Sequence, residues 1–434
     1  MIQSPSSFSK ERIRIIDSLR GFAIFGILFI NLPYMALSDV VSDPSLLNET
    51  GINRQLWLTS YWIFYGTQRA MFSLLFGASV LLFINNKQNS EEGISVADLF
   101  LRRQMWLIVF GLINVYILLW DGDIIFDYGC YGLILYVFRN LPPKKLFIAS
   151  AICALFMIAR ENRDFFIDKS IINRGELIAK IDTTVTKLTI KQKEQLAAME
   201  ELKSSSTRES CVKDVEKANR MMTGSFEDVF KYRTDTYISG FVHYTVFAIW
   251  DVLLFMFAGM AFLKLDILTC KASVKLYAAM AVIGLSIGLG INWYRLDILQ
   301  KADFNYYDFI KQMPFNVYET GRIFRSLGLF GLLMLLYKSN LFHWLFNMMK
   351  PVGQMAFTNY LSQSLIGAII FYGFGFAWYG KLQRYEVFLA GIVLMIFQII
   401  FSHIWLRYYT MGPLEWIWRQ LTYWKRLSIR KNKV

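Results

Sequence analysis

The chain has 434 residues, of which 55% are apolar and 17% aromatic, and its mean hydropathy is +0.37. This composition excludes an ordinary soluble domain and is typical of a membrane protein with aromatic residues at its interfaces. The net charge is +13, but the basic residues lie in short segments between apolar runs, and no nucleic-acid-binding motif accompanies them. We therefore expect membrane lipids, and no nucleic acid, as partners.

The Cys and His residues predict no metal site. The four Cys residues show no paired spacing, and the three His residues show no ligand spacing. A zinc site or a disulfide framework needs such spacings, so we expect neither.

Apolar runs follow one another along most of the chain, and most have the length that a bilayer-spanning helix needs. The sequence therefore predicts an all-α polytopic membrane protein of about ten transmembrane helices. The runs lie at residues 21–37, 61–83, 105–120 and 124–138, in a segment ending near 158, and at 238–263, 276–293, 323–337, 355–377 and 387–406.

A charged stretch, 161–236, interrupts this pattern. Apolar residues between 171 and 188 recur at spacings of three, four and seven, which predicts an amphipathic helix, and a Ser-rich segment at 204–207 ends the pattern. We interpret the stretch as a helical hairpin insertion outside the membrane. The chain then divides into 1–160 with spans one to five, 161–236 as the insertion, 237–424 with spans six to ten and an interfacial segment, and a basic tail at 425–434.

Lys and Arg in the short connections predict the orientation. Basic residues precede the first run and occur at 102–103, 144–145 and in the tail, whereas the turn 121–123 is acidic. Because short basic segments stay in the cytoplasm, both termini are expected there. The insertion is then extracytoplasmic.

Polar residues in the first and ninth runs predict a site inside the bundle. Asp17, Arg20 and Asn31 accompany the first run, and Asn359 and Gln363, four residues apart, share one face of the ninth. Polar groups at membrane depth are costly unless they face protein or water. We therefore expect these faces to meet in a polar seam. Further candidates for that seam are Asn114, Asp123, Tyr128, Arg322 and Glu415.

Several runs of residues together resemble the YeiB-like family of uncharacterised bacterial membrane proteins. The resemblance covers nearly the whole chain except 160–236, and it implies a location in the inner membrane. The runs are Arg14 to Asn31, Phe72 to Gly77, Arg102–Arg103 with Phe110–Gly111, Gly122 to Tyr128, Thr358 to Ser364 and Gly412 to Tyr423.

That family is similar to a wider group of transmembrane acyltransferases, which includes the heparan glucosaminide acetyltransferase. The shared element is D-x-x-R-G followed by an Asn, here Asp17, Arg20, Gly21 and Asn31. The resemblance implies transfer of an acyl group from cytosolic acyl-coenzyme A to an extracytoplasmic sugar or lipid-linked acceptor. Acyl-coenzyme A would be a co-substrate, and no tightly bound cofactor is expected.

The same resemblance makes Asn31, Asp17 and Arg20 catalytic candidates. Asn31 would hold a reacting oxygen; alternatively, it bonds a neighbouring helix. The heparan enzyme has a His shortly after this Asn, whereas the first His here is His243. His243 has the pKa range of a general base; alternatively, it is an interfacial residue bonded to a loop. Asp17 and Arg20 alternatively form an ion pair at the membrane edge.

Four basic residues, Arg102, Arg103, Arg407 and Arg419, are candidates for binding the phosphates of coenzyme A. They could equally bind anionic lipid headgroups. The seam as a whole leaves a second function open, a transporter or carrier of a small solute or lipid. Carriers show internal repeats, and no convincing duplication occurs in the sequence.

Overall fold

The computed structural model describes residues 10–38, 43–47, 50–87, 95–182, 184 and 187–431, and the side chains of 10–13, 87 and 241–247 lie outside this description. The described residues are almost entirely helical and contain no β-strand. The α-helices are α1 (Lys10–Ala36), α2 (Gly51–Thr59), α3 (Thr67–Lys87), α4 (Val96–Tyr116), α5 (Ile125–Phe138), α6 (Pro143–Ala179), α7 (Ile190–Ser205), α8 (Arg208–Met222), α9 (Phe226–Lys264), α10 (Val274–Lys301), α11 (Tyr306–Gln312), α12 (Tyr318–Lys338), α13 (His343–Gln354), α14 (Ala356–Phe371), α15 (Arg384–Tyr408) and α16 (Pro413–Tyr423), with a short 3-10 turn η1 (Pro44–Leu47) and a π-helical turn η2 (Ser60–Phe64).

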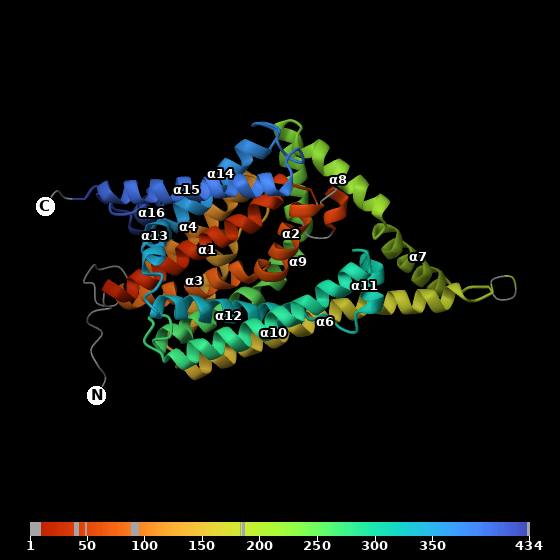
Figure 1. Ribbon diagram of the computed structural model, residues 1–434, viewed down its shortest axis with the longest axis horizontal. Helices are drawn as coiled ribbons and strands as arrows, with labels where there is room; N and C mark the ends of the chain where they lie inside the picture. Colours follow the sequence, from red (N-terminus) through yellow and green to blue (C-terminus); the bar gives the residue numbers. More distant parts are fainter. Residues whose placement is uncertain are drawn as a thin grey trace.

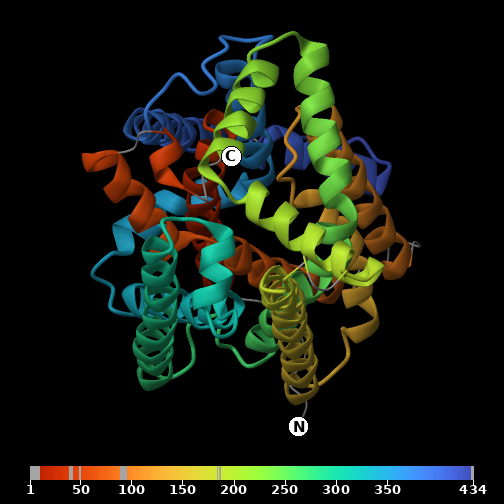
Figure 2. The ribbon, with the colours of Figure 1, turned by 90° about the vertical axis from the view of Figure 1, so that its right-hand side faces the viewer.

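Many of the long helices run roughly along the long axis of the molecule and form a bundle (Figure 1). The start of α1 and the end of the chain lie at one end of this bundle, which we call the terminal end. Helix α7 lies at the opposite end, which we call the hairpin end (Figures 1 and 2). This arrangement places both described chain ends on one side of any membrane that the bundle crosses.

Each of the ten predicted apolar runs overlaps one helix of the bundle. Among the described residues, five segments are long and apolar enough to cross a membrane, and α5 and α14 are shorter apolar helices. The predicted all-α polytopic membrane fold is confirmed. The five long segments are Arg14–Ala36, Gly51–Asn86, Val274–Lys301, Tyr318–Lys338 and Arg384–Tyr408.

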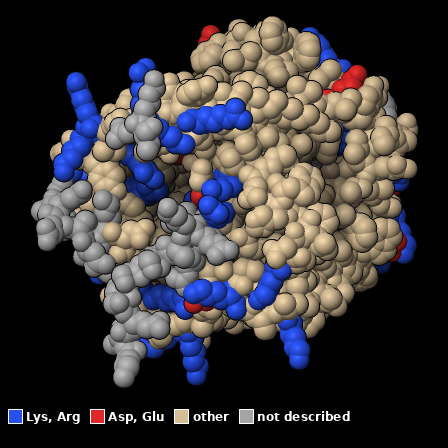
Figure 3. All heavy atoms as spheres, turned by 60° about the vertical axis from the view of Figure 1, so that its left-hand side comes forward, with Lys and Arg blue, Asp and Glu red and all other residues tan. Residues whose placement is uncertain are grey.

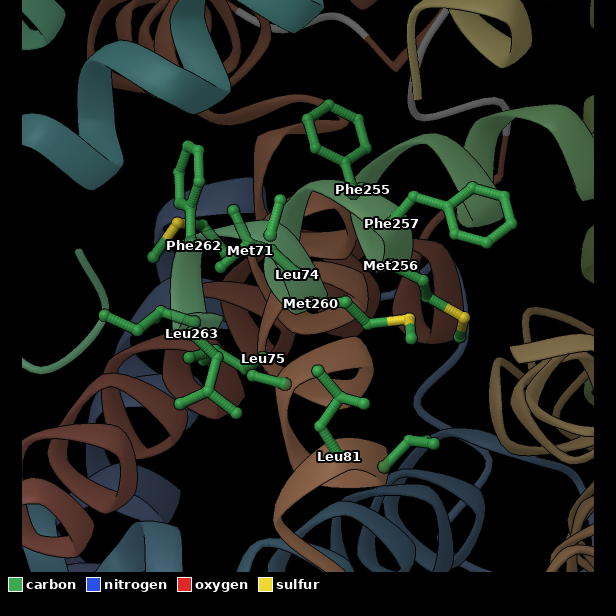
Figure 4. Packing of buried hydrophobic residues seen from close by; sticks show 14 of the residues in the cluster. Met71, Leu74, Leu75, Leu81, Phe255, Met256, Phe257, Met260, Phe262 and Leu263 are labelled. Atoms are coloured by element: carbon green, nitrogen blue, oxygen red, sulfur yellow. The ribbon is translucent and has the colours of Figure 1, made fainter. Parts of the chain in front are cut away.

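Helices α3 and α9 cross at the centre of the bundle. Met71, Leu74 and Leu75 of α3 pack against Met256 and Met260 of α9 (Figure 4). Glycines allow the backbones to touch, because a Cβ atom at position 259 would lie 1.8 Å from the carbonyl oxygen of residue 74. Small residues at such crossings are typical of membrane helices, which gain stability from close packing.

The insertion at 161–236 is continuous with the bundle. Helix α6 runs through residue 160 without a break, and α9 begins at Phe226 and runs on into the membrane core. The amphipathic helix predicted to reach residue 188 is wrong in extent, because α6 ends at Ala179; residue 185 lies outside the described residues. Instead, α7 begins at Ile190, where Thr189 and Gln192 form a capping box.

The insertion also shares side-chain packing with the bundle. Met222 and Val229 are fully buried in one hydrophobic cluster with Leu28 of α1. Arg233 of α9 donates a hydrogen bond to Asp121 in the turn between α4 and α5, with 2.8 Å between Nη1 and Oδ1. The base of the insertion therefore belongs to the hairpin end of the bundle.

Candidate functional site

A pocket of about 210 Å³ enters the bundle from the terminal end. Its walls come from α1, α3, α4, α5 and α16 and from the junction of α13 with α14. Three guanidinium groups, those of Arg20, Arg103 and Arg419, line the pocket. Figure 3 shows this end of the molecule, where Lys and Arg gather on the surface. The pocket thus opens on the most basic side of the bundle.

The pocket extends deep into the membrane core. Arg103 and Gly111 lie eight residues apart on α4, a rise of about 12 Å. The start of α5 packs on Gly111, because a Cβ atom there would lie 2.4 Å from the backbone nitrogen of Phe126. Ile125 and Tyr128, from this first part of α5, form the inner wall. The pocket therefore has a basic entrance, a largely apolar interior and a closed inner end.

Asp17 and Arg20 lie at the entrance as an ion pair. Arg20 Nη1 lies 3.0 Å from Asp17 Oδ1, and its Nη2 donates to the hydroxyl of Ser79 on α3. Gln354 donates a second hydrogen bond to Asp17, at 3.3 Å. Asp17 is buried and Arg20 is half-buried. The pair joins α1, α3 and α13 while leaving Arg20 on the pocket wall.

Arg103 is held by an aromatic ring rather than by an acid. Its guanidinium carbon lies 3.7 Å from the ring centre of Trp418, whose indole N–H donates to the Arg103 carbonyl at 3.0 Å. Among the described residues no carboxylate pairs with Arg103 or with Arg419. Arg103 is half-buried and Arg419 is exposed, and positive charge without a counter-charge favours binding of an anion.

Gln104 adds a polar group to the same wall. Its side chain is 1% exposed, and within the described part of the chain its Oε1 has no hydrogen-bonding partner. Leaving a buried polar group unpaired costs about 1–3 kcal/mol. A ligand that reaches Gln104 would remove this cost.

Glu415, predicted to lie in the seam, caps a helix. Its carboxylate accepts hydrogen bonds from the backbone N–H groups of Phe357 (2.8 Å) and Thr358 (3.1 Å) in the first turn of α14, and from the Thr358 hydroxyl. Burial raises the pKa of the Glu415 carboxyl, while the hydrogen bonds from Thr358 oppose this change. The Thr358 hydroxyl in turn accepts a hydrogen bond from the Leu414 N–H in the first turn of α16 at 3.1 Å, so each of the two motifs satisfies the helix start of the other.

Asp123 has the corresponding role at the start of α5. It accepts hydrogen bonds from the Phe126 N–H of α5 and from Asn114 Nδ2 of α4, both at 2.7 Å. Tyr128, one turn further along α5, lies 2.8 Å from the hydroxyl of Ser73 and donates to the Arg69 carbonyl at 3.2 Å. Of these three predicted seam residues, Tyr128 lines the pocket, whereas Asn114 and Asp123 bond to each other beside it.

Asn359 and Gln363 face a neighbouring helix instead of the pocket. Asn359 Nδ2 donates to Ser402 of α15 at 3.1 Å, and Gln363 Nε2 donates to Gln398 of α15 at 3.0 Å. Both side chains are buried. Of the two faces expected to meet in the seam, the one on α14 therefore bonds α14 to α15.

A buried charge cluster lies beyond the inner wall. Asp251 of α9 accepts hydrogen bonds from Arg69 of α3 and from Arg322 of α12, and Arg322 Nε also donates to Glu319 at 2.7 Å. Arg322 and Arg325 are each 1% exposed, so they do not extend toward the membrane surface as Arg residues near span ends commonly do. The sequence predicted Arg322 as a seam residue. Its ion pair with Asp251 depends on tertiary packing and could not be predicted from the sequence.

The remaining candidates lie outside the pocket. Asn31 is half-buried on α1, on the helical face that carries Arg20, since eleven residues make just over three full turns. His243 lies in α9, and its side chain is outside the described residues. Arg102 stacks on Trp424 with 4.0 Å to the ring centre, and Arg407 is exposed at the end of α15.

Comparison with known proteins gives relatives that cover nearly the whole chain. The chain is 28% identical to an uncharacterised protein, YxaH, of Bacillus subtilis, over 99% of this chain and 98% of that protein. It is 26% identical to an uncharacterised protein, YeiB, of Escherichia coli, over 95% and 96% of the two chains. The resemblance to the YeiB-like family is confirmed.

The C-terminal part of the chain, residues 262–425, also matches a family model described as a protein of unknown function, DUF418. That region supplies Gly353, Phe357 and Tyr360 on one side of the pocket, and Glu415 and Trp418 near its entrance. No solved structure matches the chain. These two relatives are similar in length to this chain, and their descriptions name no activity.

Proposed function

We propose that the YeiB-like chain is a membrane acyltransferase. Acyl-coenzyme A enters the pocket from the terminal end, and the acyl group passes to a sugar or lipid-linked hydroxyl that arrives from the hairpin end. With the basic terminal end in the cytoplasm, the protein lies in the bacterial inner membrane, and the acceptor is extracytoplasmic.

One observation carries this proposal: the pocket combines unpaired guanidinium groups at its entrance with an apolar interior. Arg103 and Arg419 have no acidic partner among the described residues, so they offer charged donors to phosphate oxygens. Phe72, Phe76 and Leu107 line the interior. A ligand that fits both regions has an anionic head and a narrow arm that ends in an apolar group, as acyl-coenzyme A has.

The size of the pocket supports partial entry of the ligand. Small-molecule sites commonly enclose about 300–1,000 Å³, which is more than the 210 Å³ found here. The pocket therefore takes the acyl group and the arm that carries it, while the nucleotide stays at the basic surface. Asn31 is on the Arg20 face of α1, about 16 Å further along the helix, and is available to an acceptor.

The alternative function, a carrier of a small solute or lipid, would use the same pocket. An anionic lipid also has a charged head and an apolar chain. A carrier has to move its whole solute past the inner wall, where Tyr128 is hydrogen-bonded to α3, whereas acyl transfer requires only that an acceptor hydroxyl reach this wall. The two functions differ in whether bound acyl-coenzyme A is consumed.

The test uses the purified protein in lipid vesicles with acyl-coenzyme A and a panel of sugar and lipid-linked hydroxyl acceptors. We expect release of free coenzyme A, and we expect Arg103→Gln to raise the KM for acyl-coenzyme A about 10- to 150-fold. This range corresponds to loss of one charge-assisted hydrogen bond of about 1.5–3 kcal/mol. The kcat of this variant should differ less from the wild-type kcat than its KM differs from the wild-type KM.

Arg102→Gln is the matched control. Arg102 is the neighbouring residue and also stacks on a tryptophan, Trp424, but it does not line the pocket. If both variants change the KM equally, the effect comes from general surface charge. If the wild-type protein binds acyl-coenzyme A and consumes none with any acceptor, the carrier becomes the better description.

A further inference from the structure

The carboxamide of Gln104 is a polar group in the pocket wall for which the fold provides no partner. Gln104 is 1% exposed and lines the pocket. Within the described part of the chain, its Oε1 accepts no hydrogen bond and its Nε2 donates none. A carboxamide can accept at its oxygen and donate at its nitrogen, so this side chain has unused capacity in both roles.

Gln104 lies where the charged entrance gives way to the apolar interior. The side of α4 that faces the pocket carries Phe100, Arg103, Gln104 and Leu107. Arg103 and Leu107 are four residues apart, a rise of about 6 Å along the helix. A ligand whose anionic head is held at Arg103 therefore has the first part of its arm beside Gln104.

The space around the carboxamide comes from a glycine on the facing helix. A Cβ atom at Gly132 of α5 would lie 2.6 Å from Gln104 Oε1 and 3.1 Å from the ring of Phe76 on α3. Gly132 is in the middle of α5, where backbone groups bond within their own helix. The two helices opposite Gln104 thus leave room for its carboxamide and offer it apolar atoms.

The other uncharged polar side chains of the pocket wall are already engaged. Each forms a hydrogen bond with another part of the bundle, so a ligand would have to compete for it. Among the described residues, Gln104 is the neutral polar group of this wall that is left for a ligand. The engaged side chains are Ser79, Tyr128, Gln354, Tyr360 and Trp418.

We propose that Gln104 is a specificity-determining residue of the pocket, which selects a ligand arm with amide and carbonyl groups over a plain hydrocarbon arm. This assignment rests on the proposed function. The pantetheine arm of acyl-coenzyme A carries secondary amides between its phosphates and its thioester, and such an amide pairs with a carboxamide as donor and as acceptor. A hydrocarbon chain in the same place leaves Gln104 buried and unpaired, which disfavours it. Gln104 thus favours acyl-coenzyme A and disfavours an anionic lipid.

The test measures binding to the full-length protein in detergent by isothermal titration calorimetry. The probes are acetyl-coenzyme A, adenosine 3′-phosphate 5′-diphosphate as the head without an arm, and an alkyl diphosphate as a head with a hydrocarbon arm. We expect Gln104→Leu, which keeps the size of the side chain and removes its polar atoms, to weaken binding of acetyl-coenzyme A about 5- to 150-fold. The Kd of the head alone should stay the same, and the alkyl diphosphate should bind more tightly.

Thermal unfolding without ligand separates recognition from a structural role. Gln104→Leu removes an unpaired buried carboxamide, so its Tm should equal or exceed that of the wild type. Gln363→Leu is the matched control, because Gln363 is also buried but donates to Gln398 at 3.0 Å and does not line the pocket. This control should lower Tm and leave the Kd of acetyl-coenzyme A unchanged.

Two results would overturn the assignment of Gln104 and leave the acyltransferase proposal intact. One is an unchanged affinity of Gln104→Leu for acetyl-coenzyme A, and the other is a loss of Tm equal to that of Gln363→Leu. Wild-type protein that binds the alkyl diphosphate and does not bind acetyl-coenzyme A would overturn both proposals.

Discussion

Asp123 is a carboxyl group that the fold holds in a partly desolvated position. Burial raises its pKa from the ordinary value of 3.8 to about 6, although the hydrogen bonds from Phe126 N–H and Asn114 act in the opposite direction. The cap of α5 is therefore formed by a group that costs free energy to ionise. This residue makes the stability of the protein depend on pH near neutrality.

The sign of that dependence follows from proton binding. Between pH values of about 4 and 6 the folded state binds more protons at Asp123 than the unfolded state does, so stability falls as pH rises through this window. Above about pH 6 the folded state carries the full free-energy cost of ionising Asp123. We expect Asp123→Asn to gain in Tm relative to the wild type between about pH 4 and about pH 7, measured by thermal unfolding in detergent. A constant Tm difference over this range would contradict the assignment.

Residue types and motifs predicted the pocket better than the inner charge cluster. Arg20, Arg103 and Arg419 were each marked by a motif or a basic segment, and all three line one cavity. Asp251 and Arg69 are 182 positions apart, and no local pattern links them. The sequence did not predict Gln104 as a pocket residue either, because an unpaired amide is recognised only when its surroundings are known.

At the scale of elements, the contact between α1 and α13 is as close as backbone atoms allow. A Cβ atom at Gly353 would lie 1.7 Å from the Asp17 carbonyl oxygen and 2.8 Å from the backbone nitrogen of Gly21. Since Gln354 also bonds Asp17, the position of the entrance ion pair depends on this contact.

We therefore expect Gly353→Ala to separate α1 from α13. Overpacking of this kind costs about 1–3 kcal/mol, and the variant should lower both Tm and the affinity for acyl-coenzyme A. The matched control is Gly290→Ala on α10, where an added Cβ atom meets nothing within 4 Å. Alanine favours helix formation, so the control should be neutral or slightly stabilising. Equal effects of the two substitutions would contradict the contact.

Hydrophobic periodicity predicted the type of each element but not every boundary. All ten apolar runs correspond to helices, since the length of an apolar run is a direct consequence of membrane thickness. The ends of the insertion were less predictable. Helices α6 and α9 continue past residues 160 and 236 because buried side chains, among them Phe165, Ile172 and Val229, pack these extensions against neighbouring elements.

At the scale of the whole molecule, the bundle predicts which segments share a side of the membrane. Lys145 and Lys425 are exposed at the terminal end, and Ser204 is exposed in the insertion. Single Cys residues at these positions, in a protein without its native Cys, should react with membrane-impermeant reagents from opposite sides. We expect positions 145 and 425 to react from the cytoplasm and 204 from outside. Positions 145 and 425 reacting from different sides would contradict the arrangement.

The unbroken helices of the insertion have a mechanical consequence. Helix α6 has 37 residues and α9 has 39, so each is about 55–60 Å long, and a hydrocarbon core takes up about 30 Å of that. Each therefore acts as a stiff rod, with one arm outside the membrane and the other inside. Because α8 packs against the outer arm of α9 and α9 carries Asp251 on its inner arm, a sideways load on α8 would act as torque on the ion pairs behind the pocket, with the pivot at the membrane surface.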